Sequence, residues 1–227
     1  MAKLVWDKTG ERLYETGVKK GVLYPMVAGA YPAGVAWNGV TAFTESPSGA
    51  EPTKLYADDI NYDTLTSAEE YGFTLEAYTY PEEWEQCDGS ASPVKGVSLG
   101  QQGRTPFGFT CVTTVGNDAL GHNYGYKLHL VWNALAGVSE KAYASINDSP
   151  EAITFSWECT TTPTEVEGFK PTASMVIDST KVNADKLAAL EAILYGGDDT
   201  EARLPLPLEV LTTLGYVKED DGTEASA

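Results

Sequence analysis

Apolar and polar residues alternate with a period of two along most of this chain. The runs GFTLEAYTYP, AITFSWECT and TASMVIDST show the alternation most clearly, and turn-forming residues bound each of them. Their alternating positions are Phe73, Leu75, Ala77 and Thr79, then Ile153, Phe155, Trp157 and Cys159, then Ala173, Met175 and Ile177. Such runs between turns are typical of half-buried antiparallel strands. The pattern predicts a mainly β, α+β protein.

The stretch RTPFGFTCVTTVGNDALGHNYGYKLHLVWNA, residues 104–134, reads as a strand, a turn and a second strand. The apolar positions that share a face are Phe107, Phe109 and Cys111 in the first strand and Tyr126, Leu128, Leu130 and Trp132 in the second. We expect Phe107, Phe109, Leu128, Leu130 and Trp132 to form core. His129 lies on the opposite face of its strand from Leu128 and Leu130.

Two segments near the end of the chain have helical rather than strand spacing. VNADKLAALEAILYGG places leucines three and four residues apart, with Asn183 as the expected N-cap and Gly196 as the stop. PLPLEVLTTLGY predicts a shorter helix with Pro207 near its start and Gly215 at its end. A single helical turn is also expected at residues 66–72, TSAEEYG.

Between Val35 and Tyr62, two strand-like segments flank the sequence SPSGAEP, which has two prolines, a glycine and no large apolar side chain. This composition predicts the tip of a long hairpin that projects from the body at about residues 45–54. The candidate tip residues are Ser46, Pro47, Ser48, Gly49, Ala50, Glu51 and Pro52. Projecting segments and open strand edges allow identical subunits to join.

The net charge of −18 is unevenly distributed, because residues 55–94 contain ten carboxylates and neither Lys nor Arg. Such a surface cannot grip the phosphates of DNA, which proteins neutralise with cations. The three cysteines are far apart and indicate reduced, buried thiols rather than a disulfide framework or a zinc site. We expect no membrane span and no secretory signal.

The sequence offers little catalytic chemistry. It has no GxSxG, P-loop or GxGxxG motif, and Cys87 has no basic neighbour to activate it. His122 and His129 could bind a metal only with further ligands, so surface or interface histidines are favoured. The carboxylates of YPEEWEQCDG are Glu82, Glu83, Glu85 and Asp88. They could bind Ca²⁺ or act as a pair, but a solvated acidic turn anchored by Trp84 is favoured. No catalytic residue, cofactor or metal is expected.

An ordered series of segments resembles the major tail protein family of tailed phages. The series is YETGVKKGVLYP, YPAGVAWNGVTAFTESPSGAEPTKLYADD, EAYTYPEEWEQCDG, FGFTCVTTVGNDALGHNYGYKLHLVWNA, INDSPEAITFSW and KPTASMVIDST. It spans roughly residues 12–182, and the region after about residue 183 matches the family less clearly. No single motif carries the resemblance; the order of the segments does.

The resemblance implies an antiparallel β-sandwich or barrel-like tail-tube fold flanked by a helix, with a long projecting loop and extended arms. We expect one domain over residues 1–217, with the two helices at about 183–216. The tail KEDDGTEASA, residues 218–227, is acidic and made of small residues and is expected to be disordered. Subunits of this family form rings, commonly six-fold, that stack into the hollow tail of a siphovirus-type virion. The expected partners are further copies, a tape measure protein, and tail terminator and distal tail or baseplate proteins. DNA passes through without specific binding, and no membrane is involved.

Three sets of residues acquire roles in this picture. The loop at about residues 45–54 is expected to carry contacts between stacked rings. The N-terminal segment, residues 1–25, is expected to pack on an adjacent subunit through Trp6, Tyr14 and Tyr24. An acidic channel wall would repel phosphate within about 8 Å at physiological salt. The candidate wall residues are Asp58, Asp59, Asp63 and Glu76.

Three alternatives remain open at the level of sequence. The first is the inner tube of a contractile tail or injection device, which shares the fold. The second is a β-sandwich carbohydrate-binding module with Trp37, Trp84 and tyrosines exposed in a shallow row. The third, an acidic hydrolase built on the carboxylates of residues 82–88, has the least support.

Overall fold

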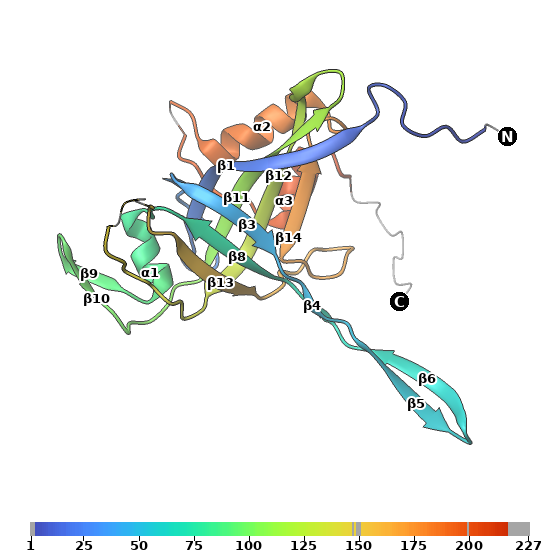
Figure 1. Ribbon diagram of the computed structural model, residues 1–227, viewed down its shortest axis with the longest axis horizontal. Coiled ribbons are helices and arrows are strands. Elements are labelled where there is room, and N and C mark those ends of the chain that lie inside the picture. Colours follow the sequence, from blue (N-terminus) through green and yellow to red (C-terminus); the bar gives the residue numbers. More distant parts are fainter. Residues whose placement is uncertain (1–2, 147, 149–150, 199, 218–227) are drawn as a thin grey trace, which may run out of the picture.

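Figure 1 shows a computed structural model of the protein, which describes residues 3–146, 148, 151–198 and 200–217. Strands dominate, and most of them belong to one large antiparallel sheet with helices against part of it. The expected mainly β, α+β fold is therefore confirmed. The expected acidic tail at 218–227 lies outside the described residues. No helix in the described part of the chain is long and apolar enough to cross a membrane.

The large sheet has the strand order β2-β1-β11-β12-β13-β8-β3, and β14 also pairs with β12. Its strands are β1 (Leu13–Pro25), β2 (Val35–Trp37), β3 (Val40–Glu45), β8 (Gly72–Ala77), β11 (Phe107–Asn117), β12 (Gly121–Ala136), β13 (Phe155–Thr161) and β14 (Ser174–Asp178). The expected hairpin at residues 104–134 is β11 and β12, which are paired along almost their whole length.

The sheet curls, so that β3 at one end approaches β1 near the other. A Cβ atom on Gly21 of β1 would lie 2.9 Å from Cγ2 of Val40, an approach that only glycine permits. The curled sheet encloses an inner core together with the short helices η1 (Glu82–Trp84) and α1 (Glu85–Asp88). The largest inner-core residues are Trp37, Phe73, Trp84, Phe107, Phe109 and Trp157.

A second, outer core lies between the other face of the sheet and the helices α2 (Ala184–Tyr195) and α3 (Pro207–Thr213). Its members include Tyr24, Leu128, Leu130, Trp132, Ile177, Leu187, Leu190 and Leu194. The Asn183 side chain caps α2 by accepting hydrogen bonds from the backbone N–H groups of Asp185 and Lys186, at 3.0 and 3.2 Å. Asn183, Gly196 and Pro207 all occupy the helix-end positions expected from the sequence.

The central strands are therefore covered on both faces along part of their length, at Gly21–Pro25 of β1, Phe107–Val112 of β11 and Leu130–Trp132 of β12. Phe107, Phe109 and Cys111 of β11 face the inner core, whereas Leu128, Leu130 and Trp132 of β12 face the outer core. The bulge at Asn133, which has a φ of 49°, adds one residue to β12 opposite Phe107–Phe109. Because that extra residue reverses the alternation, Ala134 and Ala136 face the inner core instead.

The three cysteines are free and buried, as expected. Burial raises the pKa values of the Cys87 and Cys111 thiols to about 12, because an apolar environment disfavours the thiolate. These thiols contribute to packing and are unsuited to nucleophilic chemistry.

Candidate functional site

The most prominent feature outside the body is a projecting hairpin, residues 46–71, which connects β3 to β8 (Figure 1). It contains the strand pairs β4 (Ser48–Gly49) with β7 (Glu69–Glu70) and β5 (Pro52–Ala57) with β6 (Ile60–Thr66). The chain reverses at Asp58 and Asp59, whose φ angles of 51° and 62° are typical of a tight hairpin turn.

Two sequence expectations about this hairpin were wrong. The SPSGAEP segment forms the root of the projection rather than its tip, because the strand pattern resumes at Pro52 and continues to Ala57. Proline is tolerated there as the first residue of a strand. Residues 66–72 contain strand β7 instead of a helical turn, because they pair with the root segment on the opposite arm.

One face of the outer part of this hairpin is largely apolar. The cross-strand pairs Thr53–Leu65, Leu55–Asp63 and Ala57–Ile60 place their side chains on the same face. Leu55, Ile60 and Leu65 are 41%, 63% and 54% exposed. An isolated two-stranded ribbon is marginally stable in water, and exposed apolar surface marks interaction sites. The hairpin therefore presents an exposed apolar face that is a candidate interaction surface.

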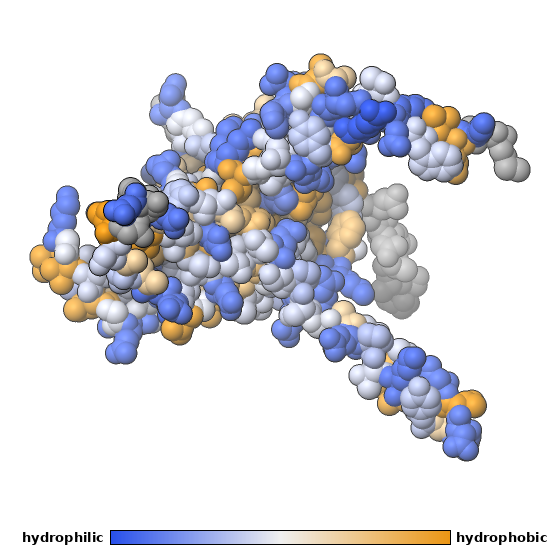
Figure 2. Space-filling view, in the orientation of Figure 1, coloured by the Kyte–Doolittle hydropathy of each residue, from blue (hydrophilic) through white to orange (hydrophobic). Residues whose placement is uncertain are grey.

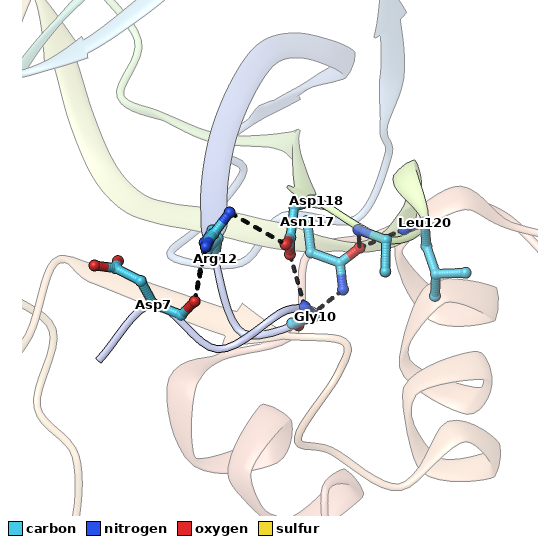
Figure 3. Close-up of polar contacts among 7 residues, drawn as sticks. Asp7, Gly10, Arg12, Asn117, Asp118 and Leu120 are labelled. Atoms are coloured by element: carbon cyan, nitrogen blue, oxygen red, sulfur yellow. Dashed lines mark hydrogen bonds and ion pairs between the residues drawn. The ribbon is translucent and has the colours of Figure 1, made fainter. Parts of the chain in front are cut away.

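The N-terminal arm, residues 3–12, leaves the body from the turn between β11 and β12. Figure 3 shows its anchor: Gly10 N–H donates to Oδ1 of Asp118 at 2.8 Å, and Nδ2 of Asn117 donates to the Gly10 carbonyl at 3.0 Å. Arg12 donates to the carbonyl of Asp7 at 2.9 Å and lies 3.9 Å from the Asp118 carboxylate. These bonds fix where the arm leaves the body, while Trp6 is 75% exposed beyond them.

The expected arm of residues 1–25 is too long, because Leu13–Pro25 forms the central strand β1. Tyr24 is fully buried, and its hydroxyl donates to the carbonyl of Leu194 at 2.8 Å. It packs within its own chain and is not available to a neighbour. Tyr14 is partly exposed but lies over Gly116, where a Cβ atom would clash with its ring. Of the three proposed arm residues, only Trp6 lies on the free arm.

The outward face of β3, β8 and β13 forms a polar surface that no helix covers (Figure 1). Register places Ala42 and Ser156 beside Glu76, and Thr44 and Glu158 beside Thr74. Their neighbours on each strand, such as Leu75 and Trp157, face the inner core. We name this set, Ala42, Thr44, Thr74, Glu76, Ser156, Glu158 and Thr160, the polar face. It combines hydroxyl groups with two carboxylates and contains no Lys or Arg.

The four acidic candidates do not form one surface. Glu76 lies on the polar face, whereas Asp58, Asp59 and Asp63 lie on the projecting hairpin. Glu158 was missed, because it lies outside the acidic stretch of the sequence. Its alternation with Trp157 and Cys159 was the signal that could have placed it opposite the core.

The two histidines lie at different places on β12, His122 near its start and His129 near its middle. His122 makes an edge contact with Tyr14, with ring centroids 5.7 Å apart. His129 lies 2.9 Å from the Thr113 hydroxyl and 3.8 Å from the Glu45 carboxylate. Burial lowers the pKa of His129, and the nearby Glu45 carboxylate partly offsets that effect. Within the described residues, no three His, Cys, Asp or Glu side chains are grouped to hold a metal ion.

The segment 82–88 forms η1 and α1 rather than an open acidic turn. Trp84 anchors it in the inner core as expected, while Asp88 is buried and pairs with Lys141. Trp37 is also buried, with its ring centroid 4.7 Å from that of Trp84. Neither tryptophan can stack on a sugar, so the expected carbohydrate-binding row is absent at these positions.

Comparison of the chain with models of protein families and with curated proteins finds no match.

Proposed function

We propose that this protein is a structural subunit of a phage tail tube, which assembles into stacked, six-fold rings around a hollow channel. The observation that carries the proposal is the projecting hairpin, with its apolar face exposed. Figure 2 shows apolar residues at the free end of this projection and along the N-terminal arm, where no residue in the described part of the chain covers them. A second copy supplies that cover.

Self-assembly also agrees with the direction of these segments. The hairpin and the arm leave the body at different places and extend in different directions (Figure 1). Contacts through such segments join unlike surfaces of neighbouring copies, which is the kind of contact that builds rings and filaments. The same role requires no catalytic group or cofactor. In the virion, a tape measure protein would fill the channel during assembly, and terminator and distal tail proteins would bind the two ends.

The polar face is the surface that we place along the wall of the channel. Glu76 and Glu158 present negative charge there, and the surrounding side chains are small hydroxyl-bearing residues or alanine. Carboxylates repel phosphate over about a Debye length, roughly 8 Å at physiological salt. A wall without cations gives DNA no counterion-releasing contacts, so the polymer slides instead of binding.

Electron microscopy of the concentrated, purified protein tests the assembly. We expect hollow tubes of uniform diameter, accompanied by a large species in size-exclusion chromatography. A variant in which a short Gly-Ser link replaces residues 47–70 should fold with an unchanged unfolding midpoint yet form no tubes. A wild-type protein that remains monomeric at every concentration, without rings or tubes, would overturn the proposal.

DNA retention tests the channel wall. Tubes of the Glu76→Lys/Glu158→Lys variant should retain short double-stranded DNA in a sedimentation assay, and salt should release it. The matched control is Glu82→Lys/Glu83→Lys, which makes the same change of charge at exposed positions of η1. Equal retention of DNA by both variants would show that the polar face does not line the channel.

A further inference from the structure

A surface pocket of about 480 Å³ lies between β1, the turn from β2 to β3, and the end of α2. Its principal lining residues are Lys19, Lys20, Val22, Asn38, Val40 and Tyr195. Both lysines are exposed and sit at an irregularity of β1, where the register shifts between Lys19 and Val22 and Lys20 has a φ of 53°. Such a bulge redirects side chains, here toward the rim of the pocket.

The pocket carries unmatched positive charge in a strongly acidic protein. Among the described residues, neither Lys19 nor Lys20 forms an ion pair, although carboxylates outnumber cations two to one in the whole sequence. The Lys20 ammonium lies 5.3 Å from the centre of the Tyr195 ring. The buried Tyr195 hydroxyl has no hydrogen-bond partner. The pocket therefore combines two exposed cations with an apolar wall that includes Val22, Val40 and the Tyr195 ring.

The tip of the projecting hairpin has the complementary chemistry. Asp58 and Asp59 form its turn, are exposed, and pair with no cation in the described part of the chain. Tyr56 and Ile60 flank the two aspartates and are exposed as well. The tip thus presents two carboxylates, with the Tyr56 side chain on one face of the ribbon and the Ile60 side chain on the other.

Strand β3 separates the pocket from the projecting hairpin. Val40, at the start of β3, lines the pocket, whereas Glu45, at its end, leads into the hairpin. Figure 1 shows the hairpin extending away from that end of the strand. A chain cannot insert its own tip into its own pocket across this distance, but a second copy placed head to tail can.

We propose that the hairpin tip of one subunit binds in the lysine pocket of a subunit in the next ring. Asp58 and Asp59 pair with Lys19 and Lys20, while Tyr56 and Ile60 pack on Val40 and Tyr195. The contact joins two different surfaces and leaves a free pocket at one end and a free tip at the other, so it propagates along the tube axis. The inference rests on the proposed tube function and identifies the stacking partner surface.

Charge reversal with rescue tests the contact. Lys19→Glu/Lys20→Glu and Asp58→Lys/Asp59→Lys should each reduce the yield of sedimentable tubes more than tenfold, and the variant that combines all four changes should recover most of it. Asp58→Asn/Asp59→Asn, which suits the left-handed turn, should give an intermediate loss. Lys95→Glu/Lys170→Glu changes the same charge at exposed positions elsewhere and should assemble normally. Unfolding midpoints of all monomers establish that they fold.

The outcomes separate this inference from the proposed function. If the wild-type protein forms no tubes, the tube function fails and the stacking contact fails with it. If wild-type tubes form and Lys19→Glu/Lys20→Glu assembles as well as its control, only the stacking contact is overturned. The pairing is also overturned if both charge-reversal variants lose tubes and the variant that combines all four changes does not recover them.

Discussion

The body and the projecting hairpin are made from the same local pattern but are stabilised differently. In the body, Gly21–Pro25 of β1, Phe107–Val112 of β11 and Leu130–Trp132 of β12 are buried on both faces, one against the inner core and one against the helices. In the hairpin, β5 and β6 are exposed on every residue. Backbone pairing is common to both regions, so side-chain burial is the difference. Side-chain burial can stabilise the body as a monomer, whereas under the proposed function the hairpin gains its side-chain contacts from a neighbouring copy.

The largest expected effect on stability lies in the inner core. Trp157 is fully buried and its ring lies 5.2 Å from Trp84 and 5.6 Å from Trp37, centroid to centroid. We expect Trp157→Ala to lower the free energy of unfolding by roughly 3–5 kcal/mol, because it leaves a large cavity. Urea denaturation measures this. Tyr62→Ala in the hairpin, where the side chain is 72% exposed, should change it by less than about 0.5 kcal/mol. Similar losses of unfolding free energy for Trp157→Ala and Tyr62→Ala would contradict the view that the body and the hairpin are stabilised differently.

A smaller loss of stability is expected from removing one hydrogen bond between the sheet and α2, the bond from Tyr24 of β1 to Leu194. Tyr24→Phe removes the hydroxyl that donates to the Leu194 carbonyl and leaves that buried acceptor without its partner. The expected loss is about 1–3 kcal/mol. Tyr14→Phe is the control, because the structure gives its hydroxyl no such bond and its side chain is partly exposed. A stability of Tyr24→Phe equal to that of the control would show that the sheet and α2 are not coupled through this bond.

Loss of the N-cap of α2 should lower the free energy of unfolding by about 1 kcal/mol. Asn183→Ala leaves the N–H groups of Asp185 and Lys186 without their side-chain acceptor. Thermal unfolding should show a lower midpoint for Asn183→Ala and a nearly unchanged one for Asn183→Asp, which keeps an acceptor oxygen. Equal midpoints for the two variants would indicate that the cap does not stabilise the body.

The smallest effect on monomer stability, and the sharpest test of the comparison, concerns the hairpin's apolar face. Leu55→Ser/Ile60→Ser/Leu65→Ser should alter the free energy of unfolding by less than about 0.5 kcal/mol, because these side chains are already in water. The same variant should lose tube formation in electron microscopy. A destabilised monomer would mean that the face is covered within its own chain, and normal tubes would mean that no neighbour covers it.

Patterns that extend over a few residues predicted which segments form strands and helices. The alternation around Leu75, Trp157 and Ile177 predicted strands with the correct core faces, and Asn183 and Pro207 marked the helix starts. Turn-forming residues were a less reliable guide to the place where the hairpin reverses. The prolines of SPSGAEP indicated a tip, but the turn formed at the two aspartates, because the strands on either side found a register that extends past the prolines.

The sequence by itself determined the β class, the two helices near the end of the chain, the buried thiols and the strong acidity, because each depends on composition or on spacing within a few residues. Only the tertiary structure decided which part of the molecule each strand face packs against. The curl of the sheet buried Trp37 and Trp84, a bulge at Asn133 turned one strand toward two cores, and pairing between distant strands brought Glu158 beside Thr74. Those outcomes depend on contacts between residues far apart in the chain, which a local pattern does not specify.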